Sequence, residues 1–293
     1  MITTAALSTA RRATVRELLD AVTAHDGVSP LDEAAVLALD ADDARHLLVE
    51  EEGELRGYAG VLPDGTVQGM VHPAHRRRGH GTALLQEALA LRPDAGVWAH
   101  GALEGSLAFL TAAGLVESRY LLTLHRALDP AQALPAIPVS TLEGLRLGTF
   151  EAERDAERWV EVNARAFADH PEQGAMTLRD LEQRIAQPWF DAEDMLVALR
   201  DEELVGFVWV KRERPGETAR DAEIYVVATD PSVQGHRVAG LLLATTLERL
   251  RAQGVPGVEL YVEADNAPAL RLYESWGFSV AGRDVQMRVP GRG

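Results

Sequence analysis

A carboxylate and an anion-binding turn share one predicted element in the C-terminal half of the chain. The stretch EIYVVATDPSVQGHRVAG, residues 223–240, begins as an apolar, β-branched run with Glu223 at its start. It stops at Asp230-Pro231 and passes through a polar turn into a helical pattern. Unpaired backbone N–H groups at a helix N-terminus can bind phosphate. The sequence therefore predicts a proton acceptor and a phosphate site fixed on one rigid element.

The first half of the chain carries a second turn of the same kind. VHPAHRRRGHGTA, residues 71–83, follows a predicted strand and precedes a helical pattern. Its glycines, Gly79 and Gly81, permit a close backbone approach that a Cβ would block, as a pyrophosphate requires. Pro73 and Pro231 lie 158 residues apart, and the elements around them follow in the same order. The chain therefore reads as two copies of one α/β unit.

The two copies differ at the positions where chemistry would occur. Eight residues before the proline stands Glu223 in the second copy and Gly65 in the first. Four residues before the later Gly-Phe or Gly-Leu pair stands Tyr273 in the second copy and Leu110 in the first. We therefore expect the second copy to be catalytic and the first to be degenerate. A solvated strand-end carboxylate and a core aromatic ring are the alternative interpretations of Glu223 and Tyr273.

Periodicity and turn residues outline the elements that must position these groups. Helices are expected over residues 10–25, 106–114, 153–168 and 177–186. A further helix, the second along the chain, is expected to be capped near Ser29-Pro30. The predicted strands include HLLVEE, GYAGVL, MLVALR, GFVWVKR and VELYVEAD. The proline-rich DPAQALPAIPVST marks a linker, so we expect domains over residues 1–140 and 141–293.

Composition excludes several classes of function. The chain has 293 residues, enough for two domains that each bury a core. It has no cysteine, and its nine histidines lack a zinc spacing such as HExxH, so we predict no metal site. The net charge of −16 argues against nucleic-acid and anionic-membrane partners. No apolar run is long enough to span a membrane and no signal peptide is recognisable, so we expect a cytoplasmic protein.

The paired motifs resemble those of the GNAT acetyltransferase family, whose acetyl-CoA loop reads Gln/Arg-x-x-Gly-x-Gly/Ala. The resemblance implies an α/β (α+β) fold of two tandem domains, each a mixed, mostly antiparallel sheet flanked by helices. The C-terminal turn departs from the pattern, because Arg237 stands at the first glycine position and Ala239 at the second. An arginine is awkward there if the position requires a positive φ.

Longer segments narrow the resemblance to the mycothiol synthase family of actinobacterial tandem acetyltransferases. The shared segments AFADHPEQG (166–174), PWFD (188–191) and LYVEADN (260–266) are not requirements of the fold. The resemblance implies the last step of mycothiol biosynthesis, which moves acetyl from acetyl-CoA to the cysteinyl amine of cysteine–glucosamine–inositol. The positions that would bind this acceptor are Glu33, Glu172, Lys211, Glu223 and Tyr261.

The same resemblance places acetyl-CoA in both copies. In the second copy its implied contacts are Val227, Ala228, Thr229, Gln234, Gly235, His236, Arg237, Val238, Ala239, Gly240, Asn266, Ala267, Pro268, Ala269, Leu270 and Arg271. In the first copy they are Gly69, Met70, Val71, Arg76, Arg77, Arg78, Gly79, His80 and Gly81. A second acetyl-CoA there would be structural or regulatory, because the first copy lacks both candidate acid–base groups.

The expected mechanism is direct attack of the amine on the thioester. Glu223 would accept the ammonium proton, and Tyr273, whose hydroxyl faces the cofactor sulfur in the family motif, would protonate the departing thiolate. Two alternatives stay open. The enzyme could acetylate another amine, such as a peptide N-terminus or an aminoglycoside, or the chain could be a non-catalytic acyl-CoA sensor. We expect a monomer.

Overall fold

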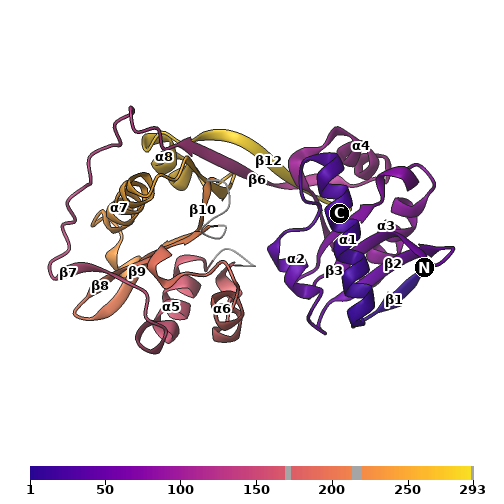
Figure 1. Cartoon of the computed structure of the whole chain (residues 1–293), viewed down its shortest axis with the longest axis horizontal. Coiled ribbons are helices and arrows are strands. Elements are labelled where there is room, and N and C mark those ends of the chain that lie inside the picture. The colour runs from indigo at the N-terminus through magenta and orange to yellow at the C-terminus, as the bar shows by residue number, and fades with distance from the viewer. Residues whose placement is uncertain (169–172, 213–219, 292–293) are drawn as a thin grey trace. The chain divides into compact units, whose positions relative to one another are not determined.

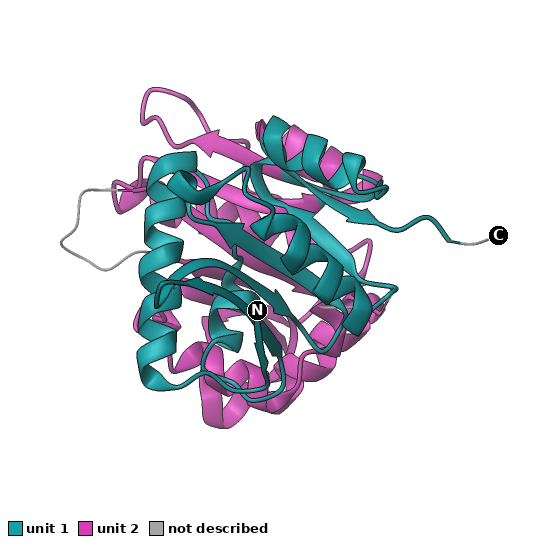
Figure 2. Ribbon diagram, turned by 90° about the vertical axis from the view of Figure 1, so that its right-hand side faces the viewer, with its two compact units in different colours: residues 1–122, 263–265, 282–293 teal, residues 123–262, 266–281 magenta. Residues whose placement is uncertain are grey.

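The computed structural model describes residues 1–168, 173–212 and 220–291, whose elements are labelled in Figure 1. Two compact units are distinguished by colour in Figure 2. Unit 1 comprises residues 1–122, 263–265 and 282–293, and unit 2 comprises residues 123–262 and 266–281. The end of the chain thus belongs to the unit built mainly from the first sequence copy. The domains 1–140 and 141–293 stay a prediction about where the repeat divides.

Unit 1 follows the predicted order of helices and strands. Its elements are β1 (Ile2–Thr4), α1 (Thr9–Asp26), α2 (Glu33–Ala38), β2 (Arg45–Glu51), β3 (Glu54–Val61), β4 (Thr66–Val71), α3 (His80–Leu91), β5 (Gly96–Ala99) and α4 (Glu104–Ala112). The second helix begins later than predicted. Its N-cap is Asp32, whose carboxylate accepts a hydrogen bond of 2.8 Å from the Ala35 N–H, and Ser29-Pro30 lies outside it.

Unit 2 repeats this order. Its elements are β7 (Leu145–Thr149), α5 (Ala152–Ala166), α6 (Leu178–Ile185), β8 (Met195–Arg200), β9 (Glu203–Lys211), β10 (Ala222–Thr229), α7 (Val238–Ala252), β11 (Gly257–Glu263) and α8 (Ala267–Ser275). Two further strands, β6 (Val116–Ala127) and β12 (Ser279–Arg288), contribute residues to both units, and the last residue of β11, Glu263, belongs to unit 1.

The strand order is the same in the two units, β1-β2-β3-β4-β5 in unit 1 and β7-β8-β9-β10-β11 in unit 2. In each unit the first four strands pair antiparallel and the fourth pairs parallel with the fifth. This arrangement confirms the predicted tandem fold of mixed, mostly antiparallel sheets. In unit 1, β5 also pairs antiparallel with Val285–Met287 at the end of β12.

Helices cover both faces of the unit 2 sheet, with α5 and α6 on one side and α7 on the other (Figure 1). The core under α5 and α6 is aromatic. Trp159 of α5 stacks on Phe207 of β9 with ring centroids 4.7 Å apart, and both rings are fully buried with Trp209. Burial of three such rings is a large part of what holds this face to the helices.

Candidate functional site

In each unit the two parallel strands separate after a short pairing. In unit 2, β10 and β11 pair from Ala222 to Ile224, although β10 continues to Thr229. In unit 1, β4 and β5 pair only at Thr66 and Val67, although β4 continues to Val71. Such a wedge leaves strand backbone available for a ligand. The wedge in each unit lies directly before a predicted phosphate turn.

A β-bulge at Tyr225 changes the direction of side chains along β10. Ile224 pairs with Val210 and Val226 with Trp209, so Tyr225 has no opposite residue on β9. A bulge turns two successive side chains toward the same face of a sheet. Tyr225 therefore packs with Val226 against the aromatic core under α5 and α6.

Glu223 lies where three strands meet. It is directly opposite Lys211 of β9 and beside Glu259 of β11 in the strand register. Residues opposite one another in a sheet share a face, so two carboxylates and one ammonium gather there. Glu259 is partly buried, and this burial raises the pKa of its carboxyl, with the nearby Asp221 carboxylate adding to the rise. The site is thus built to bind or move a cation or a proton.

The phosphate turn of unit 2 opens into a cavity of about 470 Å³. A 3-10 turn, Pro231–Val233, follows β10, and α7 begins after Arg237 with no side chain capping its first N–H groups. Seven of the predicted acetyl-CoA positions line this cavity: Thr229, Gln234, Gly235, Arg237, Val238, Ala239 and Gly240. Leu272 and Trp276 of α8 line it as well, and so does Pro138 of the linker. Free N–H groups facing a cavity at a helix N-terminus suit a phosphate.

The remaining predicted contacts of unit 2 lie outside the lining of that cavity. His236 is engaged by the linker: its backbone oxygen accepts a hydrogen bond of 2.8 Å from Ser140 Oγ, and its Nδ1 lies 3.0 Å from Thr141 Oγ1. Asn266 caps α8, accepting a hydrogen bond of 3.2 Å from the Ala269 N–H. The others outside the lining are Val227 and Ala228 of β10 and Ala267, Pro268, Ala269, Leu270 and Arg271 of α8.

Asp230 anchors the turn to helix α5. Its carboxylate accepts hydrogen bonds from the Ser232 N–H at 3.0 Å and from Ser232 Oγ at 2.8 Å. The guanidinium groups of Arg158 and Arg165, both on α5, lie 3.2 and 2.5 Å from its other oxygen. Asp230 is buried, so these charged partners fix the turn firmly.

Tyr273 lies on α8, one residue after the cavity-lining Leu272. Its ring makes an edge contact with Phe278, with centroids 5.8 Å apart. Tyr273 is half-buried, and this burial raises the pKa of Tyr273 to about 12, because it disfavours the phenolate. The hydroxyl therefore carries its proton at neutral pH.

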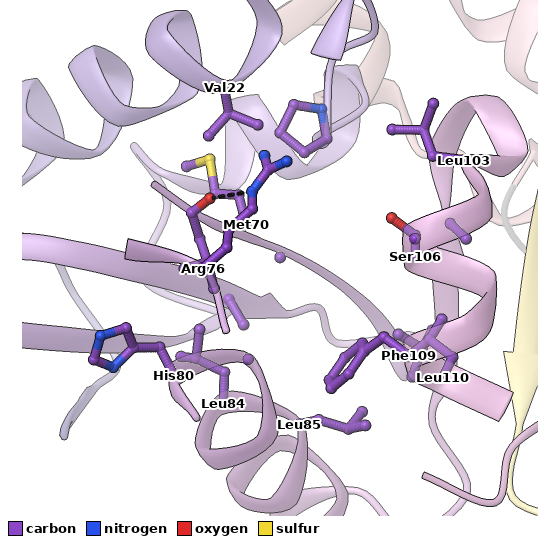
Figure 3. Close-up of a pocket in the computed structure, with 18 of the residues that line it drawn as sticks. Val22, Met70, Arg76, His80, Leu84, Leu85, Leu103, Ser106, Phe109 and Leu110 are labelled. Carbon is purple, nitrogen blue, oxygen red and sulfur yellow. Dashed lines mark hydrogen bonds between the residues drawn. The ribbon is translucent and has the colours of Figure 1, made fainter. Parts of the chain in front are cut away.

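The corresponding turn of unit 1 borders a larger cavity, of about 770 Å³ (Figure 3). Val22 of α1, Met70 of β4, Leu84 of α3 and Phe109 of α4 surround it. Of the predicted contacts, all but Arg78 line it: Gly69, Met70, Val71, Arg76, Arg77, Gly79, His80 and Gly81. The counterparts of Glu223 and Tyr273 provide no proton-transfer group, since Gly65 has no side chain and Leu110 is buried in the core.

Arg76, a predicted phosphate contact, has protein partners in unit 1. Its guanidinium donates two hydrogen bonds to Asp26, of 2.9 and 2.6 Å, and its Nε donates one of 3.2 Å to the Val71 carbonyl. The hydrogen bonds from Arg76 hold the pKa of the Asp26 carboxyl below its usual value. The Arg76–Asp26 pair fixes Arg76 at the rim of the cavity. The dashed line at Arg76 in Figure 3 is its bond to the Val71 carbonyl.

The predicted acceptor residues are found in different places. Lys211 and Glu223 are opposite one another, and Tyr261 of β11 is exposed. Glu33 is the first residue of α2 in unit 1. Glu172 lies outside the described residues.

Sequence reasoning did not single out Glu259 and Tyr225, which share a sheet face with Glu223. Alternation along VELYVEAD places Glu259 and Tyr261 on the same face, a signal that could have identified Glu259. Alternation along EIYVV places Tyr225 on the same face as Glu223, so the same signal was available for Tyr225.

Among residues 1–168, 173–212 and 220–291, no group of three His, Asp or Glu side chains is arranged to hold a metal ion. Within the same part of the chain, no helix is both long and apolar enough to cross a membrane.

Comparisons with known proteins agree with this geometry. The model of the acetyltransferase (GNAT) family matches residues 157–278, and an acetyltransferase (GNAT) domain model matches residues 42–118. A protein of Brachybacterium faecium named mycothiol acetyltransferase is 68% identical over 331 aligned residues, covering 100% of both chains. Another of that name, from Thermomonospora curvata, is 46% identical and covers 94% of this chain and 93% of its own.

Solved structures show the same tandem fold. A GCN5-related N-acetyltransferase from Sphaerobacter thermophilus matches with a TM-score of 0.67 and 25% identity, over 98% of this chain and 94% of its own. A tandem GNAT protein from the clavulanic acid biosynthesis pathway matches with a TM-score of 0.68 and 23% identity. The match covers 98% of this chain and 97% of that protein. The chain belongs to the mycothiol acetyltransferase family, a tandem-domain branch of the GNAT acetyltransferases.

Proposed function

We propose that unit 2 transfers the acetyl group of acetyl-CoA to the cysteinyl amine of cysteine–glucosamine–inositol. The observation that carries this proposal is the placement of Glu223. It lies opposite Lys211 at the closed end of the β10–β11 wedge, and the uncapped N-terminus of α7 lies beyond the other end of β10. The name of the relative with 68% identity supports the choice of acceptor.

The chemistry requires two proton transfers. Glu223 accepts a proton from the acceptor ammonium, directly or through water, and the free amine attacks the thioester carbonyl carbon. The C–N bond forms, the C–S bond breaks, and Tyr273 donates its phenolic proton to the departing thiolate. A donor must hold its proton until that moment, and the raised pKa of Tyr273 is consistent with this role.

The open wedge is proposed to stabilise the developing negative charge. Beyond Ile224 the β10 backbone, through Val227 to Thr229, no longer pairs with β11, so the N–H groups there that point away from β9 can meet the thioester oxygen. Removal of one such donor in other enzymes costs about 3 kcal/mol of transition-state stabilisation. The phosphates would lie on the turn from Gln234 to Gly240, and the start of α8, from Asn266 to Arg271, would contact the rest of acetyl-CoA.

For the acceptor, we propose that carboxylates meet the ammonium and that Lys211 and Tyr261 reach sugar hydroxyls. Glu223 is the proposed carboxylate of unit 2, and Glu33 and Glu172 stay predicted acceptor contacts. Unit 1 is proposed to hold a second acetyl-CoA in the cavity lined by Gly69 to Val71 and the Arg76–Gly81 turn. That molecule would be structural or regulatory. A cytoplasmic location and a monomeric state stay predictions.

The deciding experiment measures thiol release from acetyl-CoA with the cysteinyl sugar, with a peptide amine or an aminoglycoside, and with no acceptor. We expect turnover with the cysteinyl sugar only. Glu223→Gln should lower kcat by about 10²–10⁴-fold, and Tyr273→Phe should also lower it, with acetyl-CoA binding unchanged. Glu274→Gln, on the exposed side of α8, is the matched control and should retain wild-type kcat.

Each alternative has its own result in this assay. Faster turnover with a peptide or an aminoglycoside would identify a different acceptor. Acetyl-CoA binding without turnover on any amine would indicate a sensor. Wild-type kcat in both Glu223→Gln and Tyr273→Phe would contradict the proposed acid–base pair.

A further inference from the structure

Lys211, the single lysine of the chain, lies against two aromatic faces. Its Nζ is 4.9 Å from the centroid of the Trp189 ring and 5.7 Å from that of the Tyr225 ring. Both distances are within the range at which a ring face attracts an ammonium group. A lysine on a sheet surface normally moves freely in solvent, but these contacts hold the charged end of Lys211 in one place.

The two rings are themselves held by other side chains. The ring centroids of Trp189 and Tyr225 are 5.5 Å apart, and both rings contact the fully buried Trp209, at 5.6 and 5.2 Å. The Tyr225 hydroxyl accepts a hydrogen bond of 2.8 Å from Arg184 Nε. Arg184 in turn donates a bond of 3.1 Å to the Asp180 carbonyl of its own helix. The rings therefore form a preorganised seat for the ammonium.

This seat depends on features that a plain aromatic core would not need. Tyr225 lies two residues after Glu223 and so shares the face of Lys211 and Trp209, and the bulge leaves it with no opposite residue on β9. Trp189 comes from PWFD, a segment that fold requirements do not explain. Lys211 is also directly opposite Glu223 on the neighbouring strand. The seat thus fixes a cation on the sheet face that carries Glu223, the carboxylate proposed to receive the acceptor ammonium.

We propose that Trp189 and Tyr225 are positioning residues, which hold the Lys211 ammonium beside Glu223 and influence acceptor recognition only through Lys211. The part that concerns the acceptor rests on the proposed function. The part that concerns Lys211 alone, its confinement in the seat formed by the two rings, does not depend on that function. We call this confinement the clamp, and it can be tested with no acceptor present.

The clamp is tested by amine labelling of the full chain. Because Lys211 is the only lysine, an N-hydroxysuccinimide acetate reagent modifies only this side chain and the N-terminal amine, and peptide mass spectrometry separates the two. Trp189→Leu and Tyr225→Leu should each raise the labelling rate of Lys211 about two- to thirty-fold, which corresponds to the range of cation–π energies. Trp189→Phe keeps a ring and should largely restore the wild-type rate.

Phe190→Leu is the matched control. Phe190 is the next residue along the chain and contacts Trp209 at 5.7 Å, so its loss loosens the same aromatic cluster. We expect it to leave Lys211 labelling unchanged. Equal labelling in wild type and Trp189→Leu would overturn the clamp. An equal rise in Phe190→Leu would do so too, because the effect would then be general loosening of the core.

A double-mutant cycle tests the link to the acceptor. Trp189→Leu should raise the KM for the cysteinyl sugar about two- to thirty-fold and leave the KM for acetyl-CoA unchanged. In a Lys211→Met background the same substitution should add almost nothing. A full additional rise in that background would overturn the claim that Trp189 acts through Lys211. If labelling changes as expected but the cysteinyl sugar is not acetylated, the proposed function fails and the clamp stands.

Discussion

Two residues that the sequence singles out for proton transfer have different surroundings. Glu223 shares its sheet face with Lys211 and Glu259, a setting of mixed charge on a partly buried strand. Tyr273 lies on a helix and is half-buried, which raises the pKa of its phenol. Surroundings that separate the proton affinities of two groups suit one of them as a base and the other as an acid.

The raised pKa of Tyr273 predicts the shape of the pH profile. A phenol with a pKa of about 12 stays protonated throughout the ordinary assay range, so its ionisation should not lower kcat/KM below about pH 11. The profile should be measured from pH 6 to 10.5 for the wild type and for Tyr273→Phe. A basic limb near pH 9 that is present in the wild type and missing from Tyr273→Phe would contradict the assignment.

The phosphate turns show how one backbone path accommodates two different sequences. In unit 1 the left-handed positions are Arg77, with φ of 64°, and Gly79, with φ of 89°. In unit 2 they are Gly235, with φ of 82°, and Arg237, with φ of 61°. Each turn therefore has one glycine and one arginine at its two left-handed positions, in opposite order. Arg237 does adopt the positive φ that made it awkward in the family motif.

A left-handed conformation costs an L-residue about 1–2 kcal/mol, whereas glycine adopts it freely. Arg237→Gly and Arg77→Gly should therefore each stabilise their unit, by about 0.5–1 kcal/mol after the extra chain entropy of glycine in the unfolded state. Urea unfolding measures the change. Arg78 does not have a positive φ, so Arg78→Gly is the control and should give no stabilisation. Stabilisation by Arg78→Gly as large as that by Arg77→Gly would contradict the argument.

Across the whole chain, the end of the sequence completes the fold of unit 1. Val285, Gln286 and Met287 pair with β5 and are almost completely buried, and the two apolar side chains belong to the unit 1 core. Full burial of an apolar side chain contributes about 1.5–3 kcal/mol, and the ladder adds backbone hydrogen bonds. This contribution is a large fraction of the typical net stability of a domain, about 5–15 kcal/mol.

A chain ending at Ala281 should therefore lose most of the stability of unit 1. Hydrogen exchange should accelerate in β5 and β4, and a peptide of residues 279–291 added in trans should restore protection. A chain ending at Val289 keeps the pairing segment and is the control. Wild-type protection of β5 in the chain that ends at Ala281 would show that unit 1 does not need the Val285–Met287 segment of β12.

Local patterns in the sequence determined the repeat and the elements on which the candidate site is built. Alternation, helical periodicity and proline or glycine stops act over a few residues, because they reflect backbone sterics and the burial of one face. They located the strand–turn–helix of each copy, the lack of acid–base groups in the first copy, and most of the cavity-lining residues at Gln234–Gly240 and Arg76–Gly81.

Only the tertiary structure decided which distant segments meet. The pairing of Val285–Met287 with β5, the neighbours Lys211 and Glu259 of Glu223, and the bulge that leaves Tyr225 without an opposite residue on β9 all depend on strand register. Many registers satisfy the same alternation of apolar and polar residues, and the choice among them is made by packing of the complete core. For that reason the sequence by itself identified the chemical groups, and the folded chain determined what surrounds them.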